Sequence, residues 1–88
     1  MMLWRKTVKI NVRLFGGLAE DARLKDYDSD RGLTMNVPEG TRIKKIAKQL
    51  GLPQLHTLAF FIDGEKAGLR DRVMDGCQVT CLRPSAGG

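Results

Sequence analysis

The sequence has few of the residues that carry chemistry in enzymes and metal proteins. Its 88 residues include two cysteines, one histidine and three prolines, and aromatic residues make up only 6%. Two thiols cannot hold an iron–sulfur cluster that needs four. The single histidine, His56, has no second ligand at metal-binding spacing. No nucleophile and base of the Ser/His/Asp or Cys/His type can be assembled, so we expect no catalysis by the chain's own side chains and no metal.

Long apolar runs are also missing. None approaches the ~20 residues that a membrane span needs, and the first six residues become charged too soon for a secretory signal. Cys77 and Cys81 are four apart in an apolar, β-branched stretch. A strand would separate them by about 13 Å, beyond disulfide reach. We therefore expect two reduced, half-buried core cysteines and a cytoplasmic protein.

Positive charge is in excess. Fifteen lysines and arginines face ten acidic residues, a net charge of +5. Residues 20–31 hold five of the acids and three of the bases, which leaves twelve basic and five acidic residues, a net +7, for the rest of the chain. Such a balance favours acidic partners. Hydrophobic residues at 42% and charged residues at 28% are typical of one small globular domain.

Four segments have the pattern of strands. Residues 7–15 alternate strictly, with Val8, Ile10, Val12 and Leu14 on one face, and residues 33–37 alternate again. We expect these two to pair as an antiparallel hairpin with a long loop that could contain a helical turn near Leu18. Residues 58–62 are a third strand, ended by the turn dipeptide Asp63-Gly64. Residues 65–76 look short and irregular, and residues 77–82 form the last strand.

One segment has the pattern of a helix. Its apolar stripe recurs at helical spacing: Ile43, Ile46, Ala47 and Leu50. Thr41 is placed as the N-cap whose hydroxyl accepts a backbone N–H, and Gly51 ends the helix. The order β-β-α-β-β, with one amphipathic helix, predicts an α+β fold of the ubiquitin-like β-grasp type, a mixed sheet packed on that helix. We expect a domain over residues 1–84 and a flexible C-terminal diglycine tail over 85–88.

Two aromatic residues have the wrong parity for the core. Leu58, Phe60 and Ile62 share one face of their strand, so Phe61 points the other way, and Phe15 is likewise opposite to the apolar residues of the first strand. One interpretation is that a loop covers these rings. The other is a solvent-facing aromatic patch that binds a protein partner.

Two charged segments have an ordinary and a functional interpretation. Residues 26–32 resemble the start of a calcium-binding loop, but the glycine is one position late and Val37 stands where the glutamate belongs, so we favour a mobile acidic loop. The basic side of the helix, with Arg42, Lys44, Lys45 and Lys48, could bind nucleic acid. No aromatic residues interleave with these cations, so a solvated helix surface is the better interpretation.

The chain ends in Gly87-Gly88, four residues after the last strand is stopped by Pro84. Its carboxylate becomes a good electrophile only as an acyl-adenylate made with ATP. Because glycines lack side chains, such an arm can enter a narrow active-site channel. Ordering the arm costs conformational entropy, so a patch on the domain must supply affinity.

The chain resembles sulfur carriers of the MoaD/ThiS family over nearly its full length. The matching pieces, in order, are residues 12–15, 37–41, 50–53, 61–65 and 74–79, followed by Pro84 and Gly87-Gly88. The resemblance implies that an E1-like enzyme adenylates Gly88 with ATP, and that a persulfide or sulfide displaces AMP to leave a thiocarboxylate. No cofactor is bound by the carrier itself. Phe61, Phe15, Arg83, Pro84, Ser85 and Ala86 are the expected partner-binding residues.

In the molybdopterin branch of that family, the acceptor is the large subunit of molybdopterin synthase, of which the carrier is the small, non-catalytic partner. The length of the segment between the first two strands favours this branch. A carrier for thiamine or another sulfur-containing metabolite is an alternative, and so is a ubiquitin-like modifier that forms isopeptides through Gly88. A basic nucleic-acid-binding module is the least favoured alternative.

Overall fold

The alternating residues at the start of the chain form a hairpin, as predicted. The computed structural model describes residues 6–84, in which β1 (Thr7–Phe15) pairs antiparallel with β2 (Leu33–Pro38). The predicted helical turn is α1 (Leu18–Asp21). The main helix is α2 (Ile43–Gln49), followed by a 3-10 turn, η1 (Leu55–Thr57).

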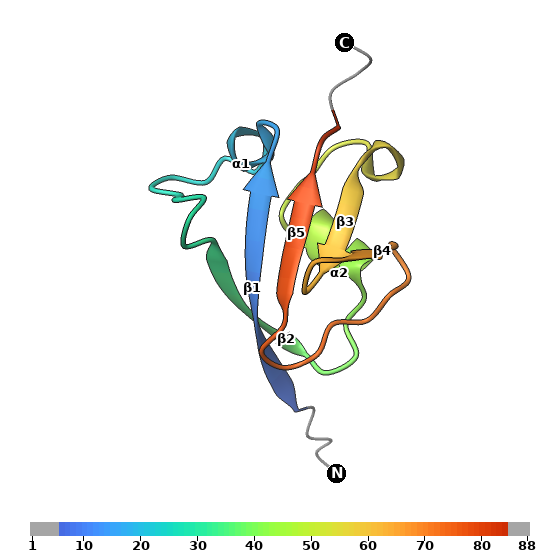
Figure 1. The fold of residues 1–88 in the computed structure, drawn as a ribbon. Coiled ribbons are helices and arrows are strands. Elements are labelled where there is room, and N and C mark those ends of the chain that lie inside the picture. Colours follow the sequence, from blue (N-terminus) through green and yellow to red (C-terminus); the bar gives the residue numbers. More distant parts are fainter. Residues whose placement is uncertain (1–5, 85–88) are drawn as a thin grey trace.

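The second half of the chain completes one mixed sheet (Figure 1). It supplies β3 (Ala59–Ile62), β4 (Glu65–Ala67) and β5 (Gln78–Leu82). The strand order is β2-β1-β5-β3-β4, and β5 runs parallel to β1 and antiparallel to β3. This arrangement confirms the predicted α+β β-grasp fold, with the C-terminal strand in the middle of the sheet.

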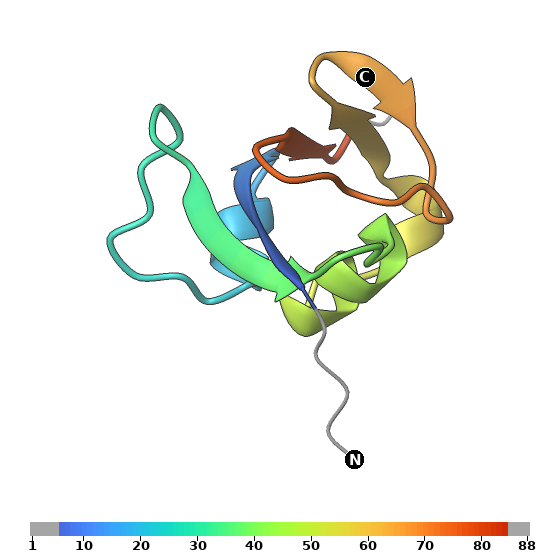
Figure 2. The ribbon, with the colours of Figure 1, turned by 90° about the horizontal axis from the view of Figure 1, so that it is seen from below.

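The core lies between the sheet and α2, and Figure 2 shows the sheet curving around that helix. The inner residues of β1 are at most 3% exposed, and the helix stripe Ile43, Ile46 and Ala47 is equally buried. Both cysteines are free and buried more deeply than predicted, because the inner face of β5 turns Cys81 toward the helix and Cys77 lies just before that strand. The domain is therefore held together by one apolar layer between the sheet and α2.

Two sequence predictions need correction. Residues 65–67 are a strand, β4, because the predicted Asp63-Gly64 turn folds them back onto β3 as an edge strand with polar residues. Thr41 is not the N-cap: Arg42 holds that position without a side-chain cap, and the Thr41 hydroxyl donates to the Pro38 carbonyl at 2.6 Å. The first helical N–H groups are satisfied instead by carbonyls of residues 69 and 71.

Candidate functional site

An apolar patch lies on the side of the sheet that faces away from α2. Strand register places Leu82 between Phe15 on β1 and Ala59 on β3, with Phe61 two residues further along β3. These four residues are called the outer patch below. Phe15 is 36% exposed and the others are half-buried, with no helix over them (Figure 1). Both phenylalanines thus lie on the outer side of the sheet, as their parity predicts, and partner binding by this patch stays a prediction.

The outer patch lies at the end of the sheet where the chain leaves β5. Leu82 is both a patch residue and the last residue of that strand, and Arg83 and Pro84 follow it directly (Figure 1). Because β5 is bonded on both sides, by β1 and β3, its position is fixed up to this residue. A partner on the patch would therefore meet the last residues of the chain within a few residues of a rigid strand.

Arg83 is held by the turn that follows β1. Its guanidinium pairs with the Asp21 carboxylate of α1 and donates to the Gly16 carbonyl at 3.1 Å. Gly16 has φ +73°, and a Cβ there would come within 2.9 Å of the Arg83 carbonyl oxygen. Glycine is therefore required for this close approach. The base of the C-terminal segment is thus fastened to α1, and Asp21 is a residue that sequence reasoning did not single out.

The acidic segment is tied to β1. The Tyr27 hydroxyl accepts from the Leu14 N–H at 2.6 Å, and Arg13 donates to the Asp30 carbonyl at 2.6 Å. Asn11 donates to the Arg31 carbonyl at 2.8 Å. Through these hydrogen bonds the long connection between β1 and β2 supports the end of β1.

Within residues 6–84 there is no group of three or more His, Cys, Asp or Glu side chains suited to a metal ion.

The buried Cys81 thiol is a poor nucleophile. Burial raises the pKa of the Cys81 thiol from 9.0 to about 12, because the thiolate would lose its solvation. The side chain belongs to the inner layer with Phe60, its register partner across β3. A protonated, inaccessible thiol does not compete for an activated acyl group.

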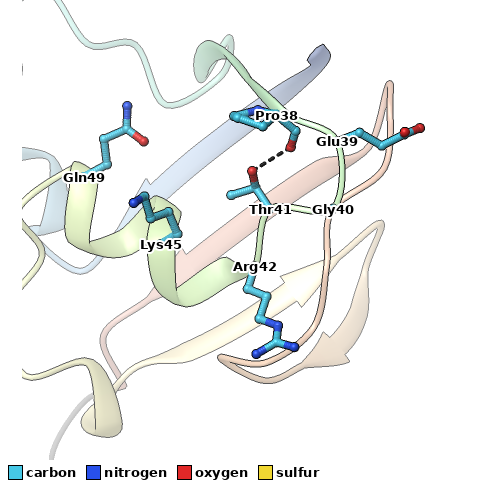
Figure 3. Close-up of a pocket in the computed structure, with 7 residues that line it drawn as sticks. All are labelled: Pro38, Glu39, Gly40, Thr41, Arg42, Lys45 and Gln49. Atoms are coloured by element: carbon cyan, nitrogen blue, oxygen red, sulfur yellow. Dashed lines mark hydrogen bonds between the residues drawn. The ribbon is translucent and has the colours of Figure 1, made fainter. Parts of the chain in front are cut away.

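A separate hollow of about 380 Å³ lies at the start of α2 (Figure 3). It is bordered by the turn before the helix and by Arg42, Lys45 and Gln49. The Thr41 hydroxyl points to Pro38 and not into a helical cap, as the dashed line in Figure 3 shows. Its lining has one carboxylate, Glu39, and no histidine or cysteine.

The predicted site residues divide into three groups. Phe15 and Phe61 lie together on the outer patch, and Arg83 and Pro84 are exposed beside it. The predicted reactive end and its approach lie outside the described residues: Ser85, Ala86, Gly87 and Gly88. His56 is exposed, as expected. Sequence reasoning placed Ala59 beside Phe61 but missed Leu82, although its alternation with Cys81 gives the same parity signal.

Within the part of the chain that the structure covers, no helix is long and apolar enough to cross a membrane.

Besides Phe15, the described residues include one more exposed large apolar side chain, Met74, at 70% exposure. It lies in the loop before β5, where Gly76 donates to the Lys9 carbonyl at the opposite end of β1 from Phe15. Met74 is therefore not part of the outer patch.

Solved structures of other proteins share this fold. A Haloferax volcanii protein superposes with a TM-score of 0.71 and 17% identity, covering 93% of this chain and 88% of that one. A Pyrococcus furiosus protein provisionally named molybdopterin converting factor, subunit 1, gives 0.65 and 15%, with 89% and 99% covered. Small archaeal modifier protein 1 of H. volcanii gives 0.65 and 20%, with 91% and 99% covered. No protein-family model and no curated protein sequence matches the chain. These similarities establish the β-grasp fold.

Proposed function

We propose that this protein is a sulfur carrier that works through its C-terminal Gly88. The observation that carries the proposal is the placement of the chain end: the central strand β5 ends beside the outer patch, and only four residues follow Pro84, the last two being glycine. A patch for docking and a narrow chain end for reaction are what an activating enzyme needs. The likeness to a protein named as a molybdopterin converting factor subunit supports this function.

The chemistry requires no side chain of the carrier. An E1-like enzyme joins the Gly88 carboxylate to the α-phosphate of ATP and releases pyrophosphate. Sulfide then displaces AMP from the acyl-adenylate, or a persulfide does so and a thiol reduces the resulting acyl disulfide. Either route leaves a thiocarboxylate, a soft nucleophile that the carrier presents to an acceptor enzyme. Because Cys81 stays protonated, the adenylate is not lost to this thiol.

We propose molybdopterin biosynthesis as the pathway, with the large subunit of molybdopterin synthase as acceptor. Delivery to thiamine or another sulfur-containing metabolite uses the same carrier chemistry. A second candidate function, protein modification through an isopeptide at Gly88, is favoured by the likeness to small archaeal modifier protein 1. Mass spectrometry of the protein from its native cells separates the two: replacement of one C-terminal oxygen by sulfur supports the carrier, and lysine-linked adducts support the modifier.

Deletion of Gly87 and Gly88 tests both functions. We expect an unchanged thermal unfolding curve, because glycines have no side chain to bury, and complete loss of the ATP–pyrophosphate exchange catalysed by the activating enzyme. A chain with one alanine added after Gly88 is the matched variant, because it keeps both glycines but moves the carboxylate. Exchange that persists in the deleted chain would contradict the proposed function.

A further inference from the structure

A group of basic side chains surrounds the start and the outer side of α2. Four of them, on α2 and its N-cap, line one hollow of about 200 Å³ with no apolar side chain among its lining residues: Arg42, Lys44, Lys45 and Lys48. The structure adds two more that the sequence did not connect with the helix, Arg70 and Arg72. These six exposed residues are called the basic face below.

Backbone pairing brings the two added arginines to the helix. Residues 42 and 72 form an antiparallel β-bridge, flanked by hydrogen bonds from Ile43 N–H to Asp71 O at 2.9 Å and from Val73 N–H to Thr41 O at 2.9 Å. Residues directly opposite in such a bridge have neighbouring side chains, and like charges there are destabilising. Arg42 and Arg72 therefore stand side by side at a cost to the free energy of folding.

No acid that the structure describes relieves this repulsion by an ion pair. The two ion pairs of residues 6–84 join Arg31 to Asp28 and Arg83 to Asp21. Asp71, the acid nearest in sequence, accepts a hydrogen bond from the Gly68 N–H at 2.7 Å. Apart from the basic face, the chain has nine basic and ten acidic residues. The net positive charge of the protein is thus concentrated on this one surface.

We propose that the basic face binds the phosphate backbone of double-helical nucleic acid. A protein partner is ordinarily anchored by aromatic or aliphatic side chains at the centre of the interface, and the hollow is lined only by arginine and lysine, whose alkyl stems form its walls. Single strands are bound through aromatic side chains, and the described ones are elsewhere: in the core, against Leu14 or on the outer patch. Duplex phosphates need cations alone.

The position of the basic face makes it independent of the proposed sulfur transfer. Its residues belong to α2, its N-cap and the segment that pairs with the helix start, and Figure 2 shows α2 on one side of the sheet. The outer patch belongs to the opposite side of the sheet, because its residues alternate with the buried ones of β1, β3 and β5. A partner enzyme on the patch and a duplex on the helix do not compete for the same surface. A negative result for duplex binding therefore does not bear on the proposed sulfur transfer, and a negative result for sulfur transfer does not bear on duplex binding.

The test is a salt titration of the full chain with labelled RNA and DNA duplexes, followed by fluorescence anisotropy. We expect both to bind, with a slope of log affinity against log salt of up to about −5.4 for the DNA duplex, at about −0.9 for each of the six cations that contacts a phosphate. The double substitution Arg42→Gln with Arg72→Gln should make the slope shallower by about 1.8. Arg42→Lys with Arg72→Lys should retain the slope, since a phosphate contact needs only the charge.

A double substitution of Lys9 and Lys25 to Gln is the matched control, because it gives the same net charge from exposed residues elsewhere. It should keep the wild-type slope. Equal loss in the two glutamine pairs would overturn the proposal, since binding would then follow net charge and not this face. Tighter binding to single strands, or displacement of the duplex by an equal charge of poly-glutamate, would also overturn it.

Discussion

Substitution of Gly16 tests how closely the C-terminal segment is fastened to the domain. Gly16 and Gly40 both have left-handed backbones, with φ of +73° and +83°. An alanine in that conformation costs about 1–2 kcal/mol, of which about 0.4–1 kcal/mol is offset by the lower entropy of the unfolded chain. A Cβ on Gly40 would meet no atom within 4 Å, so Gly40→Ala should cost no more than the difference of these two terms, about 0–1.6 kcal/mol.

Gly16→Ala carries an additional steric cost. Its Cβ would lie 2.9 Å from both the Cβ and the carbonyl oxygen of Arg83 and 3.2 Å from its nitrogen, so backbone must move. Such overpacking costs about 1–3 kcal/mol. We therefore expect the unfolding midpoint of Gly16→Ala to lie roughly 5–20 °C below that of Gly40→Ala, at about 4–8 °C per kcal/mol for a domain of this size.

Circular dichroism during heating measures the two midpoints. Pyrophosphate exchange with the activating enzyme, assayed at a temperature well below both midpoints, measures function. Displacement of Arg83 should separate its guanidinium from Asp21 and shift the base of the chain end, so exchange should fall in Gly16→Ala and remain in Gly40→Ala. Equal midpoints for the two variants would refute the close approach on which this reasoning depends.

Two further predictions concern neighbouring strands. Phe61→Ala should reduce affinity for the activating enzyme at least tenfold but cost less than about 1.5 kcal/mol of stability, whereas Phe60→Ala, at 2% exposure, should cost about 3–5 kcal/mol. Urea unfolding and a binding titration measure both, and a similar stability loss for the two would show that Phe61 is a core residue. Because folding raises the pKa of Cys81 from 9.0 to about 12, the folded state holds this proton more tightly, and its contribution to stability is complete below pH 9 and lost as the pH rises toward 12. Over that window the wild type should lose up to about 1.4 kcal/mol per pH unit more than Cys81→Val, and parallel pH profiles from urea unfolding would contradict this burial effect.

The elements that the sequence predicts well are those whose pattern repeats along the chain. The alternation from Val8 to Leu14 and the helical stripe from Ile43 identify β1 and α2 because each residue's environment follows from its spacing. Parity also identified Phe61 as an outward residue. By contrast, β4 has three residues of mixed polarity: the turn before it, Asp63-Gly64, is predictable, but the three residues carry no alternation that marks a strand.

What the sequence could not provide is proximity between distant segments. Thr41 has a good N-capping side chain, yet residues 69–71 reach the helix start and supply the acceptors instead. The same pairing places Arg72 opposite Arg42 and converts a basic helix surface into a larger basic face. Likewise, the pairing of Arg83 with Asp21 depends on parallel strands β1 and β5 ending together. Each of these contacts forms only when the whole domain has folded.

The central position of β5 limits what a partner must supply to bind the chain end. Since β5 is paired on both sides through Leu82 and Arg83 is fastened to α1, at most the five residues from Pro84 onward need to be ordered by the partner. At about 1–2 kcal/mol per residue, that ordering costs at most about 5–10 kcal/mol. Burying about 200–400 Å² of apolar surface offsets it, at about 25 cal/mol per Å². An interface of standard size, with roughly 800 Å² per partner and over half of it apolar, exceeds this area, and the remainder offsets part of the lost translational and rotational freedom. Under the proposed function, an apolar patch beside the exit of a central strand therefore lets a small domain present a short reactive end to its partner.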